Sequence, residues 1–561
     1  MRHSGPGVVH DVAVSADEAV LARGRRGFAL GAVCTLLFLT FLDNTIVSIA
    51  LGDIQQDTHA GVQALQWIVN AYALVFASMM LAAGALGDRF GHRKVMFVGA
   101  AIFAAGSVIC ALAQSSGVLI GGRAVMGLGA AASEPATLAM LRHLYPGRRE
   151  RARATGIWAA VSGLALALGP VVGGVIVGVA NWHWIFWFNL AFGLAALAVG
   201  ARVLPETARS VTRRIDTLGA LLGAAALAAL VFGVIEGESA GFTAGHVIVL
   251  FCCAGVFGIA FAWWQRRAPE PLIPPKYLRV PSFAASNVVA FAAYFGTFAV
   301  FFFCALYLHV VVEQSGLRIA VQFVPMTVAM ILASLVTGRW VSRANAGRPI
   351  LAGCVVFAAG LLLTDQVLGP HEPYLPLALS LMVVGIGIGI TVVPTTFSAV
   401  NAVPLDRAGM ASSSVNTSRE IGAVAGTAIL GAIVNSSLIS HLNTQLDKLG
   451  LSTLKGFVIP EVLHGGAAFT TGGGSGGGNG GGGGGGLASH ATTPLAKHLL
   501  ESVYSAFYSA LHVCLVLSAI VVVVAGVAAA IAMCRESVPG MPGATTDVEA
   551  AEAAARPASA P

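Results

Sequence analysis

The stretch Gly84-Ala-Leu-Gly-Asp-Arg-Phe-Gly-His-Arg-Lys94 decides the fold, because it is a short basic turn between two apolar runs, 66–86 and 95–113. Each run has the roughly 20 residues that a helix needs to cross a bilayer. Glycines permit a tight turn between two helices, and Asp88 can accept hydrogen bonds or face a helix N-terminus. Basic side chains keep such a turn on the cytoplasmic side. The stretch therefore predicts two transmembrane helices joined inside the cell.

Apolar runs of this length recur along nearly the whole chain. Of its 561 residues 56% are apolar and only 10% are charged, with a mean hydropathy of +0.81, which is too little charge for the surface of a soluble protein. We predict an all-α polytopic membrane protein with about fourteen transmembrane helices. The predicted spans are 27–51, 66–86, 95–113, 117–141, 154–179, 184–204, 217–236, 246–265, 283–309, 319–341, 349–367, 375–399, 420–440 and 510–533.

The distribution of basic residues predicts the orientation. With the N-terminus inside, nearly all of the 32 Lys and Arg fall in the tails and the cytoplasmic loops, where such residues are retained. Arg123 lies within a span, and the basic residues expected outside are Arg318, Lys448, Lys455 and Lys497. We expect both termini in the cytoplasm of a multi-pass protein of the bacterial cytoplasmic membrane. The net charge of +6 then reports topology and gives no case for nucleic-acid binding.

Two pairs of similar segments indicate an internal repeat. The turn 84–94 has a weaker echo in 338–348, and Arg153-Ala-Thr-Gly156 has one in Arg407-Ala-Gly409, both at an offset of about 254 residues. Internal repeats are typical of secondary transporters, whose sites lie between the halves. The predicted units are a cytoplasmic tail 1–26, a six-helix bundle 27–206, two linking helices with their loops 207–281, a six-helix bundle 282–535 with a Gly-rich extracytoplasmic loop 441–509, and a cytoplasmic tail 536–561.

Cysteine usage gives no sign of a bound metal or of disulfides. All eight cysteines fall inside the predicted spans or at their ends, without partners in the loops. We expect no metal site and no cofactor. The run of glycines through Gly486 has the composition of a flexible linker, and a passive loop or a role at the exit both remain open.

With these segments in view, the chain resembles the major facilitator superfamily, and within it the fourteen-span drug:proton antiporters of the EmrB/QacA type. The turn 84–94 matches the cytoplasmic signature of that superfamily, G-x-L-x-D-R-x-G-R-K. The resemblance implies that this turn is a latch between the halves, broken and remade in alternating access; a turn that only sets topology is the alternative. Its motif residues are Gly84, Gly87, Asp88, Arg89, Gly91, Arg93 and Lys94.

Three further segments carry the resemblance. Span 154–179 contains a segment close to the antiporter motif, with Gly169, Pro170, Gly173 and Gly174; the motif implies export, and plain helix packing is the alternative. Arg123 belongs to a segment similar to the intramembrane-arginine motif, and because a guanidinium in hydrocarbon costs roughly 2.5–3.5 kcal/mol it should face a cavity or a partner. The resemblance implies that Arg123 assists proton transfer. The segment Leu42–Ser48 is like another family motif and makes Asp43 a candidate for proton or cation binding, or a cap near the membrane surface.

The stretch Gly127–Leu141, GLGAAASEPATLAML, places a carboxylate inside an apolar run. Glu134 lies eleven residues after Arg123, about three helical turns and 16 Å away, so we expect both side chains on one face. A carboxyl that water reaches, and from which a cation displaces the proton, would supply antiport chemistry. We predict Asp43 and Glu134 as proton-binding candidates and Arg123 as the charge that tunes them. A neutral carboxyl kept for helix packing is the alternative for Glu134.

The predicted function is secondary active export of amphipathic drugs or natural products in exchange for protons, not catalysis. Candidate cavity residues are Asn44, Tyr294, Phe298 and Phe301; the aromatic ones have helical spacing and could bind a cation or only pack. Glu420, where the family usually has Gln, could pair with Arg419 at the surface or alter gating. Import, sodium coupling, and a polytopic enzyme or sensor remain alternatives. Expected partners are a small amphipathic substrate, cationic or neutral, protons and lipid, with the protein as a monomer; the sequence identifies no accessory export partner.

Overall fold

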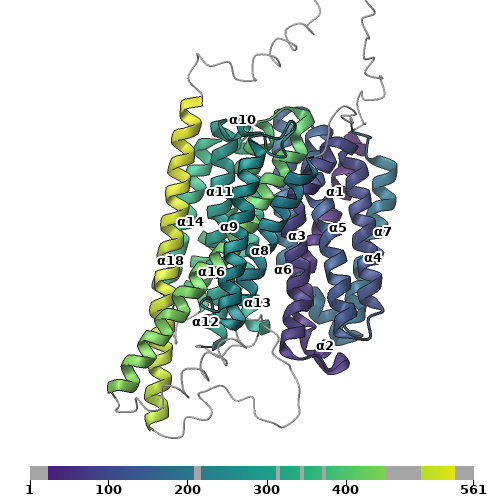
Figure 1. Ribbon diagram of the computed structural model, residues 1–561. Helices are drawn as coiled ribbons and strands as arrows, with labels where there is room; N and C mark the ends of the chain where they lie inside the picture. Colours follow the sequence, from purple (N-terminus) through teal and green to yellow (C-terminus); the bar gives the residue numbers. More distant parts are fainter. Residues whose placement is uncertain are drawn as a thin grey trace, which may run out of the picture.

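The computed structural model describes residues 23–207, 216–310, 316–341, 346–368, 374–448 and 494–536, and within these ranges every regular element is a helix. Most of the predicted tails, and the Gly-rich part of the loop 441–509, lie outside the described residues. In Figure 1, α10 and the C-terminal end of α18 lie at one end of the bundle and α2 at the other. The all-α polytopic fold is confirmed.

The first part of the chain forms seven helices. Gly91, with a φ of 95°, ends one helix and lets the next begin at His92, a conformation that favours glycine. The Ser115 hydroxyl accepts a 3.5 Å hydrogen bond from the backbone N–H of Val118 and so caps another helix. The helices are α1 (Arg23–Ile49), α2 (Leu51–Thr58), α3 (Val62–Phe90), α4 (His92–Ala111), α5 (Ser116–Leu144), α6 (Arg148–Val179) and α7 (His183–Val203).

A hairpin of two helices follows, α8 (Thr217–Ala240) and α9 (Gly245–Gln265), and then the short α10 (Pro275–Leu278). The Asp216 carboxylate caps α8 by accepting from the N–H of Gly219 at 2.8 Å. It also accepts from Trp264 Nε1 at 2.7 Å and Gln265 Nε2 at 3.0 Å, which ties the end of α9 to the start of α8. The α8 helix packs on α3 and α16, so this hairpin lies against both parts of the bundle.

The second part of the chain begins at α11. A π-helical turn, η2, continues α11 directly into α12. The elements are α11 (Pro281–Phe298), η2 (Ala299–Cys304), α12 (Ala305–Val310), α13 (Gly316–Val341), α14 (Gly347–Val367), α15 (Tyr374–Asn401), η3 (Leu405–Arg407), α16 (Ala408–Lys448) and α18 (Pro494–Glu536).

Thirteen helices in the described part of the chain are long and apolar enough to cross a membrane. They correspond to all of the predicted spans except 420–440, which lies inside α16 and is not among the thirteen. Some side chains in that part of α16 lie outside the described residues. The helix itself is continuous from Ala408 to Lys448 and packs against α11, α18 and α3.

The buried side chains form two large apolar cores. One is built mainly from α1 and α3–α7, and the other from α11–α16 and α18; we call these two parts of the bundle the N-half and the C-half. The halves meet closely along α3 with α16 and along α6 with α13. A Cβ built at Gly156 of α6 would lie 2.8 Å from the Ser334 carbonyl oxygen, and one at Gly338 of α13 would lie 2.7 Å from that of Ala152. Glycines therefore set the close approach of the halves.

Candidate functional site

Arg123 and Asp43 form a buried ion pair in the N-half. Arg123 of α5 is 1% exposed and Asp43 of α1 is fully buried. Asn189 of α7 donates a 2.8 Å hydrogen bond to the other Asp43 oxygen, and Arg123 Nε donates to the Ile68 carbonyl of α3 at 3.0 Å. The Tyr72 ring lies 4.5 Å from the guanidinium carbon. Each charge has its partners, and the network ties four helices together, with Asn189 Oδ1 as its one buried oxygen without a hydrogen-bond partner among the described residues.

The sequence predicted that Arg123 faces a cavity or a partner, but spacing alone did not identify Asn189 or Tyr72, since they come from other helices. Asn44, the next residue on α1, is half-buried. In the structure Arg123 pairs with Asp43, so Arg123 is not the positive charge that lies beside Glu134. The charged groups that act electrostatically on Glu134 are Glu420 and Arg419, both on α16 of the opposite half.

Glu134 lies on α5 where this helix packs against α16. Its side chain is 3% exposed, and its Oε2 has no hydrogen-bond partner among the described residues. The carbonyl of the next residue, Pro135, accepts a 2.8 Å hydrogen bond from the Ser412 hydroxyl of α16. The carboxyl is therefore buried between the halves with one unsatisfied oxygen, which is costly unless the group is neutral or holds a ligand.

Arg419 is the cation at this interface. It is 3% exposed, donates to Asn416 Oδ1 at 2.9 Å and also bonds to the Thr396 hydroxyl. Its guanidinium carbon lies 5.7 Å from the centre of the Trp158 ring of α6 and 5.4 Å from that of Tyr294 of α11. Arg419 is thus held between one aromatic ring from each half. The idea of a surface pair with Glu420 is wrong, because Arg419 is buried and bonded elsewhere.

The predicted aromatic residues separate into two environments. Tyr294 lies beside Arg419, whereas Phe301 stacks on Phe323 of α13 with ring centres 5.4 Å apart and belongs to the packing of the C-half. Phe298 is half-buried at the end of α11. Of the three aromatic candidates, Tyr294 is the one that the structure brings to the interface cluster of Glu134, Arg419 and Glu420.

The turn between α3 and α4 contacts the opposite half. Asp88 accepts hydrogen bonds from the backbone N–H groups of Gly409 at 2.7 Å and Met410 at 2.9 Å, at the N-terminus of α16. A carboxylate is favourable there because of the helix dipole. A Cβ built at Gly84 would lie 2.2 Å from the Ser413 hydroxyl oxygen. The turn thus joins the halves.

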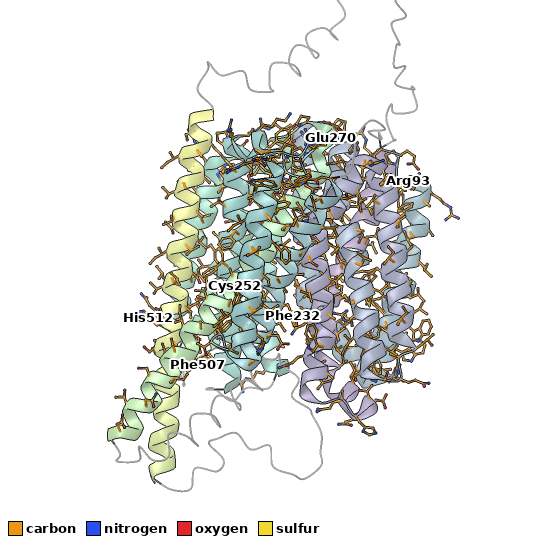
Figure 2. The ribbon with its side chains drawn as sticks, viewed as in Figure 1. Arg93, Phe232, Cys252, Glu270, Phe507 and His512 are labelled. Atoms are coloured by element: carbon orange, nitrogen blue, oxygen red, sulfur yellow. The ribbon has the colours of Figure 1, made fainter. Side chains whose placement is uncertain are left out.

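Several residues of the turn contact the N-half or lie at its surface. Arg93 forms an ion pair with Glu206 and donates to the Ala201 carbonyl at 2.8 Å. The guanidinium of Arg89 lies 5.2 Å from the Phe90 ring, and Lys94 is exposed. A Cβ at Gly87 would meet the His92 ring at 2.7 Å. Figure 2 shows Arg93 and Glu270 at the same end of the bundle.

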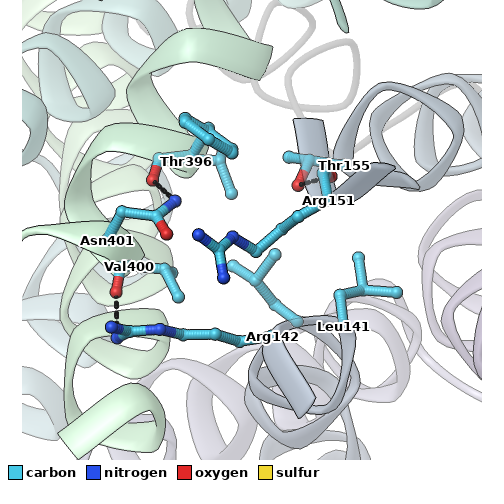
Figure 3. A pocket seen from close by; sticks show the side chains of 9 residues that line it. Leu141, Arg142, Arg151, Thr155, Thr396, Val400 and Asn401 are labelled. Atoms are coloured by element: carbon cyan, nitrogen blue, oxygen red, sulfur yellow. Dashed lines mark hydrogen bonds between the residues drawn. The ribbon is translucent and has the colours of Figure 1, made fainter. Parts of the chain in front are cut away.

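A second contact closes the halves at this end. Arg142 Nη1 donates to the Val400 carbonyl at 2.5 Å (Figure 3). It also donates to the Pro404 carbonyl at 3.2 Å. Between Arg142, Arg151, Asn401 and their neighbours is a cavity of about 10 Å³, room for one water molecule. These contacts therefore close this end of the bundle. Outside the spans, burial raises the pKa of Tyr145, whose hydroxyl donates to the Arg26 carbonyl at 3.1 Å.

The predicted antiporter motif is a helix-packing surface. A Cβ at Gly169 of α6 would lie 1.9 Å from Thr45 Oγ1, and one at Gly173 would lie 2.9 Å from the Ile46 carbonyl oxygen of α1. A Cβ at Gly174 would meet nothing within 4 Å, and the side chain of Pro170 is outside the described residues. Two of its glycines therefore allow α6 to approach α1.

A cavity of about 700 Å³ lies between the α8–α9 hairpin and α16. Phe232 and Cys252 mark the two hairpin helices in Figure 2. The cavity is lined almost only by apolar side chains: Leu230, Val234, Phe242, Phe251, Val424, Ala425, Ala428, Ile429, Ala432, Ile433 and Ser436. Among the described residues no three His, Cys, Asp or Glu side chains are grouped to hold a metal, and their cysteines are free.

Comparison with known proteins identifies the family. The model of the Major Facilitator Superfamily matches residues 33–427. The multidrug resistance protein Stp of Mycobacterium tuberculosis is 33% identical over 76% of this chain and 79% of its own length. The methylenomycin A resistance protein of Bacillus subtilis is 33% identical over 73% and 88%. The tetracenomycin C resistance and export protein of Streptomyces glaucescens is 34% identical over 74% and 77%.

Solved structures share the fold. The human organic anion transporter MFSD10 matches with a TM-score of 0.55 at 14% identity, over 80% of this chain and all of that one. The proton:xylose symporter XylE matches with a TM-score of 0.52 at 13% identity, over 79% and 94%. Together with the family model and the resistance proteins, these matches establish that the chain belongs to the major facilitator superfamily and is a membrane transporter rather than an enzyme.

Proposed function

We propose that this transporter exports a small amphipathic compound from the cytoplasm in exchange for protons, by alternating access between the two halves. The observation that carries the proposal is Glu134, a carboxyl buried at the interface of the halves with one oxygen unsatisfied. A proton satisfies that oxygen in one state and a bound substrate displaces the proton in another. Because one site holds either the proton or the substrate, movement of the two is coupled.

Export of drug-like compounds follows from the relatives, whose names record resistance to several antibiotics and, for tetracenomycin C, export. Each proton that moves down 100 mV supplies about 2.3 kcal/mol, enough for roughly a 40-fold substrate gradient. Asp43 and Arg123 neutralise each other. We therefore assign the exchanged proton to Glu134 and a supporting role in the N-half to the Asp43–Arg123 pair.

The proposed setting is the bacterial cytoplasmic membrane, with both termini and the closed end of the bundle in the cytoplasm and lipid around a monomer. In that orientation the contacts of Asp88 and Arg142 close the cytoplasmic side. Opening this side admits substrate from the cytoplasm. Its closure, with opening of the opposite side, releases substrate outside.

Inverted membrane vesicles test the function. A proton gradient should drive uptake of a fluorescent amphipathic dye and substrate-dependent proton efflux in the parent protein. Glu134→Gln should abolish both while the protein remains folded in the membrane. Glu236→Gln is the matched control, since Glu236 lies on α8 with its carboxylate 3.8 Å from His246 of α9. Unchanged coupled transport in Glu134→Gln would refute the assignment.

A further inference from the structure

Two arginines share the small cavity at the closed end of the bundle. Arg142 of α5 and Arg151 of α6 both line this cavity of about 10 Å³. Figure 3 shows the Arg151 guanidinium pointing into the space between Arg142 and Asn401. Neither arginine forms an ion pair with a carboxylate of the described residues. Two positive charges that share a cavity repel each other, so the arrangement is costly unless an anion lies with them.

Arg151 also carries a donor without an acceptor. Its Nε is buried and has no hydrogen-bond partner among the described residues, whereas its Nη1 donates to the Pro146 carbonyl at 3.3 Å. The neighbouring polar groups of the cavity wall use their donors elsewhere. The Thr155 hydroxyl donates to the Arg151 carbonyl, and Asn401 Nδ2 donates to the Phe397 carbonyl. A buried N–H group without an acceptor indicates that a ligand or a water molecule supplies one.

We propose that this cavity is a binding site for a monatomic anion, chloride, held by Arg142 and Arg151. A water molecule would supply an acceptor to Arg151 Nε but would leave both charges uncompensated. An anion supplies the acceptor and also neutralises one of the two charges. The cavity has room for one water molecule, which excludes polyatomic anions such as phosphate or a lipid headgroup. Chloride is the abundant anion that is only slightly larger than water.

The described residues place no carboxylate in the cavity that could take the role of the anion. Glu150, which precedes Arg151 in α6, pairs with Arg26. Asp406 of η3 is exposed and does not line the cavity. The wall that α15 contributes is uncharged and consists of Thr396, Phe397, Val400 and Asn401. The lining of the cavity is therefore positively charged, as an anion site requires.

Anion binding stabilises the closed end, because the cavity exists only while the halves are together. Arg142 and Arg151 belong to the N-half, and the uncharged wall belongs to α15 of the C-half. Opening separates the two walls and exposes both guanidinium groups to water. A ligand that binds one arrangement shifts the equilibrium toward it. At a chloride concentration ten times the dissociation constant, the closed arrangement gains about elevenfold over the open one. The site is independent of the proton exchange at Glu134.

Thermal unfolding of the purified full-length protein in detergent tests the site. Chloride is the probe, and gluconate, which is too large for the cavity, replaces it at constant ionic strength. The unfolding temperature of the parent protein should rise as chloride replaces gluconate. Arg151→Gln removes the free Nε–H group and one charge, so its unfolding temperature should be the same in both salts. Arg149→Gln removes an exposed arginine of the same helix and should keep the chloride response of the parent. Arg151→Lys keeps the charge without the Nε–H group and should need several-fold more chloride for the same rise.

Bromide locates the ion directly. Crystals of the closed parent protein grown in bromide should show an anomalous peak between Arg142 and Arg151, and no peak there would leave a water molecule in the cavity and overturn the site. Equal unfolding temperatures of the parent in chloride and gluconate, or an undiminished chloride response in Arg151→Gln, would overturn it as well. If Arg151→Gln does not fold, Arg151→Lys decides in its place, and a chloride response equal to that of the parent would reject the role of the Nε–H group.

Discussion

Replacing Asp88 with asparagine should open the end of the transporter that is closed in this structure. The Asp88 carboxylate accepts hydrogen bonds from the backbone N–H groups of Gly409 and Met410, in the first turn of α16, across the boundary between the halves. Asparagine keeps one acceptor oxygen but loses the charge and the second acceptor. The lost charge-assisted hydrogen bond is worth about 1.5–3 kcal/mol, and the lost interaction with the helix dipole about 0.3–1 kcal/mol.

A total of roughly 2–4 kcal/mol corresponds to a 30- to 1,000-fold shift from the closed toward the open arrangement. Spin labels at Arg149→Cys and Leu405→Cys, on a cysteine-free background, would report the separation of the halves at this end, because both residues are exposed there. We expect Asp88→Asn to convert a short interspin distance into a long one. Asp53→Asn removes an exposed carboxylate on α2, at the other end, and should leave the distance unchanged. A distance distribution of Asp88→Asn equal to that of the parent would show that these bonds do not hold the halves together.

Two further predictions concern stability, measured by thermal unfolding in detergent. Asp43→Ala leaves Arg123 buried without its partner and should lower the free energy of unfolding by about 3–5 kcal/mol. The double variant Asp43→Ala with Arg123→Met should recover much of that loss, because no unpaired charge stays buried. An equal loss of stability in the single and the double variant would contradict this account of the ion pair. Gly385→Ala places a Cβ 2.0 Å from the Met326 carbonyl oxygen and should lower the free energy of unfolding by about 1–3 kcal/mol, because it separates α13 from α15. Gly174→Ala is the control and should be neutral, because its Cβ would meet nothing within 4 Å. Similar unfolding temperatures of the two variants would refute this account of the packing.

The helices of this protein were predictable because each apolar run exceeds the thickness of a bilayer, and because lipid leaves the backbone no alternative to internal hydrogen bonding. The turn at Gly84–Lys94 was predictable for the same reason, since its glycines and basic residues stand between two such runs. Its contact with Gly409 and Met410 was not visible in the spacing. That contact depends on how two halves pack, which periodicity within one helix does not encode.

Arg123 illustrates where helical geometry alone misleads. The eleven-residue spacing to Glu134 correctly suggests two polar groups on one helix, but it gives no information about which neighbouring helices approach each of them. Asp43 of α1 pairs with Arg123 within the N-half, and Asn189 of α7 donates to the other oxygen of Asp43. Sequence reasoning recognised that a charge in a span needs a partner; only the packing shows that the partner is Asp43.

Glu420 shows how the packing changes the meaning of a substitution. Read along the sequence, a glutamate beside Arg419 suggests a local ion pair, yet adjacent residues of a helix point about 100° apart. Arg419 donates hydrogen bonds to Asn416 and Thr396, so its guanidinium is held by those two side chains. The place of a glutamate in the sequence therefore does not show which groups it meets; the packing of α16 against α5 decides that.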